Sequence, residues 1–230
     1  MSTVNSVTTD EVEVQTGRRL RADAARNQQR ILAAARELFA TRGLEITLDD
    51  VAEHAGVGVG TVYRRFANKQ QLIDGVFEEN IGRMAEQAEL ALQHPDPWEG
   101  LVMYLQYACE NMALNRGLGE VISSLDDGRE RVARVRERMQ PLGEQLIERA
   151  SATGALRPGI ESGDFFAFIY MIGSFADFAR AANQDTWRRY FTILLDGLRA
   201  DCGLRDPLTI PALTGEEIDQ AKAACLGQKR

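Results

Sequence analysis

The chain has few of the residues that metal centres and disulfide frameworks require. Its 230 residues include only three cysteines and two histidines. The cysteines, Cys109, Cys202 and Cys225, are far apart, and neither histidine has a second potential ligand nearby in the sequence. We therefore expect no metal, no cofactor and no disulfide framework. The cysteines are interpreted as reduced structural thiols, with a redox-sensing role left open for Cys109.

Long apolar runs are also missing. No stretch reaches about eighteen consecutive apolar residues, the length that a membrane-spanning helix needs. The N-terminus lacks the charged-then-apolar pattern of a secretory signal. We therefore expect a cytoplasmic protein with no membrane partner. A content of 44% hydrophobic and 27% charged residues is that of an ordinary globular protein with one or two domains.

The familiar catalytic motifs are absent as well. The sequence contains no nucleophile elbow, no phosphate-binding glycine loop and no paired histidine or cysteine ligands. Asp177 and Arg180 lie one helical turn apart in an apolar stretch. A buried ion pair or a polar anchor for a ligand explains this pair better than catalysis does. We expect no catalytic residue and hence no enzyme.

Charge is unevenly distributed along the chain. The net charge of −7 argues by itself against nucleic-acid binding. Residues 18–69 nevertheless hold ten Lys/Arg against six Asp/Glu, a local charge of +4, whereas residues 1–17 carry −3 and residues 70–230 carry −8. A local positive field is what steers a protein toward phosphate, although a window of this length also reaches +4 by chance.

The segment Thr47–Phe66 is typical of two short helices joined by a turn. Thr47 and Asp50 fit a capping box at the start of the first helix, and Gly56 fits its left-handed end. The apolar residues of this helix recur at i, i+3, i+4 and i+7: Leu48, Val51, Ala52 and Ala55. They predict one packed face.

The second helix is predicted over Val59–Phe66, with Gly58 as its N-cap and Val57 buried in the turn. Val62 and Phe66 lie four residues apart on one face. The other face carries small or hydrogen-bonding residues: Gly60, Thr61, Tyr63, Arg64 and Arg65. Small residues allow close approach to a DNA groove, and the donors can reach phosphates or base edges. The pattern predicts a DNA-binding helix-turn-helix.

The run AGVGVGTVYRRFANKQQLI, preceded by this capped helix and by RNQQRILAAARELFATRGL, resembles the DNA-binding domain of the TetR/AcrR (tetracycline-repressor-like) family of bacterial transcriptional regulators. The resemblance covers roughly residues 24–81. It implies a set of residues that contact phosphates or base edges: Thr47, Val59, Gly60, Thr61, Tyr63, Arg64, Arg65 and Lys69. Arg65 occupies a place where the family often has histidine, and it can make the same contact with a permanent charge.

Three residues depart from the family pattern. Val59 stands where many relatives have a polar base reader, Gly58 where they often have serine, and Asp49 where some have arginine. Because a valine can contact only a thymine methyl group, base discrimination is expected to depend on Thr61 and Arg64. Asp49 should point away from phosphate.

Apolar periodicity predicts further helices and no competing strand pattern. A supporting helix is expected at 24–41 and a linking helix at 69–93, followed by a break at His94–Pro97. Later helices are expected at 98–115, 117–125, 128–152, 162–182 and 185–202, with Pro141 kinking or splitting the third of them.

The predicted fold is therefore all-α, with an N-terminal three-helix helix-turn-helix DNA-binding domain and a C-terminal helical ligand-binding and dimerisation domain. The expected divisions are a disordered tail with a basic arm at 1–20, the DNA-binding domain at 21–68, the linking helix at 69–93, the second domain at 94–203 and a C-terminal extension at 204–230.

Two groups of residues in the second domain suggest binding surfaces. Aromatic, thioether and polar side chains typical of a site for a small amphipathic molecule are the ligand-binding candidates: Trp98, Met103, Tyr104, Tyr107, Phe168 and Asp177. For each of these residues, packing in the protein core is a more common role than contact with a ligand. A helix that is apolar all round needs cover from a partner, and the expected dimer residues are Phe175, Phe178, Tyr190, Phe191, Leu194 and Leu198. In the resembled family this pair of helices forms the dimer interface.

We thus expect a sequence-specific transcriptional regulator, a repressor by family resemblance. Its partners would be double-stranded DNA with a pseudo-palindromic operator, a second copy of the chain, and a small hydrophobic or amphipathic effector that releases the DNA. The alternative is a DNA-organising dimer with no small-molecule effector, which would show little sequence preference. An enzyme is a weaker alternative still.

Overall fold

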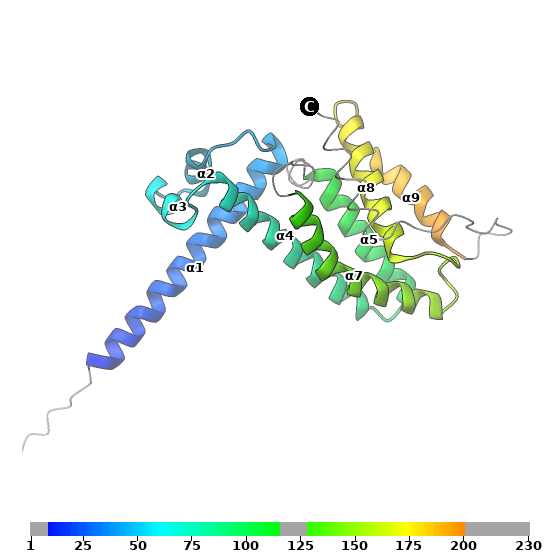
Figure 1. The fold of residues 1–230 in the computed structure, drawn as a ribbon, viewed down its shortest axis with the longest axis horizontal. Coiled ribbons are helices and arrows are strands. Elements are labelled where there is room, and N and C mark those ends of the chain that lie inside the picture. The colour runs from blue at the N-terminus through cyan, green and yellow to red at the C-terminus, as the bar shows by residue number, and fades with distance from the viewer. Residues whose placement is uncertain (1–8, 116–127, 201–230) are drawn as a thin grey trace, which may run out of the picture. The chain divides into compact units, whose positions relative to one another are not determined.

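The structure is a computed structural model that describes residues 9–115 and 128–200, and the side chains of residues 22–115 and 133–200. Within these residues the secondary structure is helical (Figure 1). The helices are α1 (Thr9–Arg42), α2 (Leu48–Ala55), α3 (Val59–Arg65), α4 (Lys69–Leu92), α5 (Pro97–Leu114), α7 (Gly128–Ala152), α8 (Ser162–Ala179) and α9 (Trp187–Leu198). The predicted all-α fold is confirmed.

The chain divides into two compact units, Met1–Leu38 with Ile46–Val76 and Phe39–Glu45 with Phe77–Arg230. The division falls inside α4, whereas the sequence led us to begin the second domain at residue 94. The reason is a row of buried small residues in the later part of α4 that belongs to the core of the second unit: Ala85, Ala88 and Ala91. The break at His94–Pro97 only ends the helix.

Local capping signals define α2 in the first unit. The Asp50 backbone N–H donates to Thr47 Oγ1 at 3.1 Å, and the Thr47 N–H donates to Asp50 Oδ2 at 2.7 Å. Gly56 ends the helix with φ of 63°, a left-handed conformation that costs glycine little. The predicted capping box and glycine C-cap are confirmed, with Thr47 as the N-cap just before the helix.

Apolar faces of α1, α2, α3 and α4 form the core of the first unit. Its buried members include Ile31, Ala35, Leu48, Val51, Ala52, Val62, Phe66 and Leu72. Gly75 of α4 lies close to this core, since a Cβ there would be 3.1 Å from both Leu32 Cδ2 and Phe66 Cε1. Val57 is only half-buried, so our expectation of a fully buried turn residue is wrong.

The first helix is longer than its apolar periodicity indicated. We expected it to begin near residue 24, after a disordered tail, but α1 begins at Thr9. Half of residues 9–20 are good helix formers, and an established helix extends at the gain of one hydrogen bond for each added residue. Periodicity marks only the packed part of a helix, so it underestimates an extension of this kind. The tail prediction is wrong for residues 9–20, and residues 1–8 lie outside the described part.

The other helices agree with their predicted positions to within a few residues. The helix α7 is continuous over Gly128–Ala152 although Pro141 lies inside it, so it is not split there. The helix α8 (Ser162–Ala179) ends three residues earlier than predicted, and α9 (Trp187–Leu198) begins two residues later and ends four residues earlier. The helix expected at 117–125 and the extension at 204–230 lie outside the described residues.

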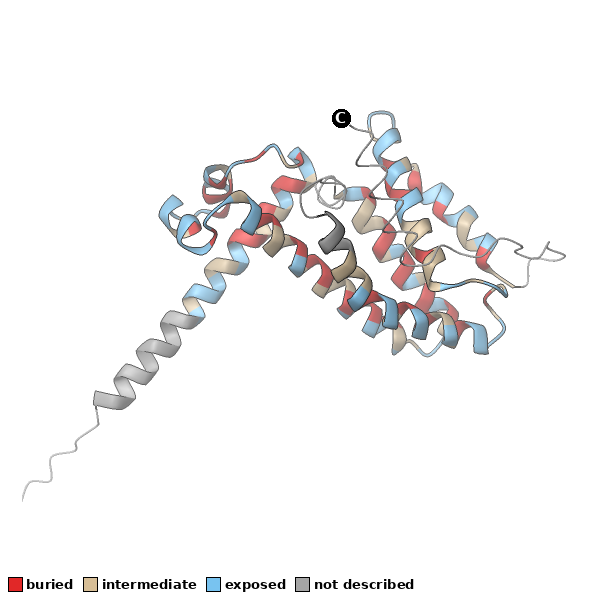
Figure 2. Ribbon diagram, in the orientation of Figure 1, coloured by how far each residue is buried: buried red, intermediate tan, exposed pale blue. Residues whose placement is uncertain are grey.

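In the second unit α5 is the central helix, because it packs against α7, α8 and α9. Figure 2 shows its buried surface surrounded by these neighbours. The buried residues of α5 include Leu101, Tyr104, Leu105, Ala108 and Cys109. At one point α5 and α8 approach closely enough that a Cβ at Gly173 would overlap Met112. Gly173 therefore lies on the inward side of α8, with Phe165, Ile172 and Ala176.

Arginine side chains complete the ends of helices in both units. Arg30 donates to the Ala55 carbonyl of α2 at 2.8 Å, and Arg180 donates to the Ala113 carbonyl of α5 at 3.1 Å. Arg149 donates to the carbonyl of Leu92, the last residue of α4, and to that of His94 just after the helix. The last carbonyls of a helix lack partners and carry partial negative charge, so a guanidinium there is stabilising.

Within the described residues no helix is long and apolar enough to cross a membrane.

Candidate functional site

The helix α3 has one packed face and one open face. Val62 is buried in the first unit, and so is Phe66 directly after the helix. On the open face Tyr63 is 50% exposed and Val59 is 45% exposed. Gly60, Arg64 and Arg65 are exposed and Thr61 is half-buried. The structure therefore brings the residues that the sequence selected for base contacts together on one accessible surface.

Gly60 is the least constrained residue of this surface. A Cβ at this position would meet nothing within 4 Å, so no packing contact in the described part of the chain requires glycine. A glycine inside a helix costs about 0.5–1 kcal/mol relative to alanine. The absence of a side chain at Gly60 is explained if a partner approaches the helix at this point.

The two arginines at the end of α3 differ in their surroundings. Arg64 Nε donates to the Gly60 carbonyl at 3.1 Å and its Nη2 lies 3.4 Å from Thr61 Oγ1. Its guanidinium is thus held over the start of the helix, beside the expected base readers. Arg65 Nη2 instead donates to Gln28 Oε1 of α1 at 2.6 Å. Arg65 therefore joins α3 to α1 and has further donors for an outside partner.

The remaining DNA-binding candidates lie at helix starts. The Thr47 hydroxyl accepts from the Asp50 N–H and donates to Asp50 Oδ2 at 2.7 Å, so it is engaged in the cap. Lys69 is the first residue of α4 and is half-buried. The Gln71 N–H of that helix donates to Asn68 Oδ1 at 2.9 Å. Asp49 is exposed.

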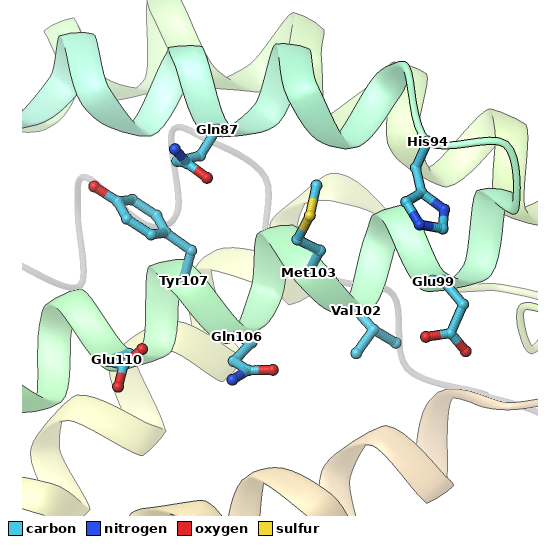
Figure 3. A pocket seen from close by; sticks show the side chains of 8 residues that line it. All are labelled: Gln87, His94, Glu99, Val102, Met103, Gln106, Tyr107 and Glu110. Atoms are coloured by element: carbon cyan, nitrogen blue, oxygen red, sulfur yellow. The ribbon is translucent and has the colours of Figure 1, made fainter.

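A groove lies along α5 in the second unit, with a volume of about 390 Å³. Figure 3 shows its lining from α5 and from α4, together with the loop that follows α4. The lining residues are Gln87, His94, Glu99, Val102, Met103, Gln106, Tyr107 and Glu110. Of the ligand-binding candidates, Met103 and Tyr107 are in this set.

The other ligand candidates lie elsewhere. Trp98 and Tyr104 are buried in the core around α5, and Phe168 packs against that core. Asp177 has a side chain that is 69% exposed, with its Oδ1 3.4 Å from Arg180 Nε. The interpretation of this pair as buried is therefore wrong. Asp177 lies two residues before the end of α8, on its exposed side.

Burial keeps the side chain of Cys109 in the protonated thiol form. Its side chain is 1% exposed, and burial raises the pKa of the thiol to about 12. The pKa of the neighbouring Tyr104 hydroxyl is raised as well, by burial first and by Cys109 second. Because the thiolate is the reactive form, Cys109 is an inert core residue and a redox-sensing role does not fit.

The outer side of α8 and α9 carries several large apolar side chains that are exposed. They are Tyr170, Met171, Phe178, Tyr190 and Ile193. Phe178 is 85% exposed, and the rings of Phe175 and Tyr190 lie 4.4 Å apart beside it. Phe175 and Leu194 are half-buried.

Phe191 and Leu198 were expected at the dimer interface, but both are buried in the core of one protomer. For these two residues the prediction is wrong, because they share with Trp187 the inward face of α9. Phe191 follows Trp187 by four residues and precedes Leu198 by seven, a helical spacing that could have assigned all three to one packed face. Ile193, which is 54% exposed, was not among the residues expected there.

Comparison with known proteins identifies the family. The model for "Bacterial regulatory proteins, tetR family" matches residues 31–76, and that for "Transcriptional regulator SbtR-like, C-terminal domain" matches residues 96–200. The HTH-type transcriptional repressor BepR of Brucella suis biovar 1 (strain 1330) is 32% identical over 150 residues, or 62% of this chain and 68% of that protein. The chain belongs to the TetR family.

Solved structures of TetR regulators have the same fold. The TetR transcription regulatory protein from Mycobacterium vanbaalenii has a TM-score of 0.62 and 29% identity, over 78% of this chain and 99% of that one. FadR from Bacillus subtilis, in complex with stearoyl-CoA, has a TM-score of 0.59 and 18% identity, over 76% and 99%. The latter likeness concerns the fold alone.

As a member of the TetR family, the protein is a DNA-binding transcriptional regulator and not an enzyme. The family match over residues 31–76 contains α2 and α3. The match over residues 96–200 contains the exposed α8–α9 face and six of the eight residues that line the α5 groove, all except Gln87 and His94. Sequence reasoning identified the first region well, but it missed the polar lining of the groove because Gln87, Glu99 and Gln106 are unremarkable in the sequence.

Proposed function

We propose that this protein is a homodimeric repressor that leaves its operator when a small molecule binds the second unit. The observation that carries the proposal is the open face of α3, where Tyr63 and Arg64 are exposed and Gly60 leaves room for a close partner. Its place of action would be the cytoplasm, where the DNA is.

On DNA, two copies of α3 would enter successive major grooves about 34–36 Å apart, on a pseudo-palindromic operator. Thr61 and Arg64 would read base edges, with Val59 limited to a thymine methyl group. Tyr63 and Lys69 would bind phosphates, which position the helix without specifying sequence. Arg65 and the helix start after Thr47 would add phosphate contacts.

The second copy would be held through the outer face of α8 and α9. An exposed phenylalanine such as Phe178 is costly in water, and burying apolar surface contributes about 25 cal/mol for each Å². Exposed apolar patches that gather on one face mark interaction sites. A symmetric dimer covers the same patch on both chains, so a single surface is sufficient.

The effector would bind the α5 groove and act through α4. Gln87 of α4 lines the groove, whereas the first residues of the same helix belong to the DNA-binding unit. A ligand that binds the two states of the protein unequally shifts their populations. Displacement of α4 would then change the spacing of the recognition helices. BepR is named a repressor, which supports the sign of regulation proposed here.

The test is binding of the purified protein to its own upstream DNA and to a scrambled fragment, by mobility shift at a stated salt concentration. A discrete complex with the native fragment alone is expected. Equal, salt-sensitive binding to both fragments would instead favour a DNA-organising dimer with no effector.

A further inference from the structure

The α5 groove has a layout that indicates the chemistry of its occupant. Its two charged side chains, Glu99 and Glu110, are both acidic, and Figure 3 shows them toward opposite ends of the lining. Among the described residues, no Lys or Arg belongs to the lining itself, although Arg188 and Arg199 lie beside the two carboxylates. We propose that the groove binds a linear diamine or polyamine, with one terminal ammonium group at each of these carboxylates.

The spacing of the two carboxylates sets the length of the ligand. Glu99 and Glu110 are eleven residues apart on α5, which is close to three full turns, so both lie on the same side of the helix. The distance along the axis is about 16 Å at 1.5 Å for each residue. The ligand must therefore be extended, with its charges at its ends.

Between the carboxylates the lining suits a methylene chain with occasional nitrogen atoms. Val102 and Met103 provide apolar surface, and the Gln106 amide can accept from an N–H group. Tyr107 and Gln87 point toward each other across the groove (Figure 3). The ring of Tyr107 can also attract a cation over its face. A volume of about 390 Å³ lies within the range of small-molecule sites.

Two arginines of the α9 region compete for the same carboxylates. Arg188 Nη2 lies 2.6 Å from Glu110 Oε1, and Arg199 Nη2 lies 4.0 Å from Glu99 Oε1. A carboxylate has about four acceptor sites, so one arginine does not saturate it. Arg188 Cζ also lies 4.7 Å from the centroid of the Trp187 ring. This contact can hold the arginine in position when Glu110 also binds an ammonium group. A bound ammonium group must nonetheless compete with this positive charge.

Because of this competition, substitutions of the glutamates and of the arginine should change ligand affinity in opposite directions. We would measure spermine binding to the DNA-free protein by calorimetry at about 0.15 M salt, where long-range attraction to a net negative chain is screened. Glu99→Gln and Glu110→Gln should each weaken binding about fivefold, the effect of one partly exposed ion pair. Arg188→Gln should strengthen it about threefold, because it removes the competing cation.

The control variant is Glu89→Gln. Glu89 is exposed on α4 and outside the lining, so this variant removes the same charge and should leave spermine affinity unchanged. Putrescine, whose amino groups are too close together to reach both carboxylates, should bind at least tenfold more weakly than spermine. Absence of spermine binding, equal binding of putrescine, or indifference to both glutamate substitutions would overturn the proposal.

The role of the amine as effector rests on the proposed function, but its binding does not. Because polyamines also bind DNA, the calorimetry uses no DNA, and operator binding is measured separately without amine. Loss of spermine binding with an intact operator complex would defeat only the ligand assignment. Spermine binding that depends on Glu99 and Glu110 in a protein without operator specificity would defeat only the proposed function.

Discussion

The open faces of α3 and of α8–α9 are exposed for different reasons. The α3 face carries Thr61, Tyr63 and Arg64, whose polar groups are well hydrated while they wait for a partner. The α8–α9 face carries Phe178, Met171 and Ile193, whose exposure to water is unfavourable. A polar face can remain exposed to water while no partner is bound, whereas an apolar face is more stable when a partner covers it permanently. The first is suited to reversible DNA binding and the second to a stable dimer.

The largest effect is expected from breaking the apolar face. Phe178→Arg places a charge on the surface that we propose to be buried between two copies, so the protein should become monomeric. Operator affinity should fall by about 10²–10⁴-fold, because the two half-sites are no longer linked. Sedimentation velocity measures the first result and a mobility shift the second.

Leu90→Arg is the matched control for this change. Leu90 is an exposed apolar residue on α4, outside α8 and α9, and its substitution should leave both the dimer and operator affinity intact. A Phe178→Arg protein that still sediments as a dimer would show that another surface holds the two copies together.

A smaller effect is expected on the polar face. Arg64→Ala should cost about 1–3 kcal/mol on the operator and relax base preference at one position, because the guanidinium is held beside Thr61. Lys69→Ala should weaken binding to all DNA alike and reduce the salt slope by about 1. Binding to operator variants at several salt concentrations separates the two. Equal loss on every sequence for both variants would contradict the assignment of Arg64 as a base reader.

The interior of the second unit should respond to pH through the buried thiol of Cys109. The thiol of Cys109 has an ordinary pKa of 9.0, raised to about 12 in the folded protein. Its stabilising contribution is therefore complete below pH 9 and is lost as pH rises from about 9 to 12. From pH 8 to pH 10 the free energy of unfolding should fall by about 1.4 kcal/mol more than in Cys109→Ala.

Urea unfolding of the two proteins at both pH values measures this difference. The buried hydroxyl of Tyr104 is common to both proteins, so its contribution largely cancels. Parallel loss of stability in the wild type and in Cys109→Ala would mean that the thiol ionises as easily in the folded protein as in the unfolded chain.

The two faces also differ in how far the sequence could predict them. The capping box of α2, the C-cap at Gly56 and the open side of α3 depend on residues a few positions apart, so the local pattern was sufficient. In α8 nearly every residue is apolar, and periodicity cannot say which side turns inward. That orientation depends on contacts with other helices, such as the close approach of Gly173 to Met112, two residues about sixty positions apart.

The groove was predicted only in part for a related reason. We looked for aromatic and thioether side chains, and this found Met103 and Tyr107. It also selected Trp98 and Tyr104, which fill the core, because composition does not distinguish a cavity lining from packing. Glu99, Gln106 and Gln87 line the groove through the meeting of α4 with α5, a contact that no local pattern contains.

The smallest expected effect separates folding from function at Gly60. Gly60→Ala should raise the free energy of unfolding by about 0.5–1 kcal/mol, because alanine is the better helix former and its methyl group meets nothing within 4 Å among the described residues. Operator affinity should nevertheless fall by about 1 kcal/mol, since the same methyl group crowds a closely packed partner. Gly82→Ala on α4, where a Cβ also meets nothing, should give the same gain in stability and leave operator affinity unchanged. If Gly60→Ala binds the operator as tightly as Gly82→Ala does, the DNA does not approach α3 at this residue, and the glycine needs another explanation.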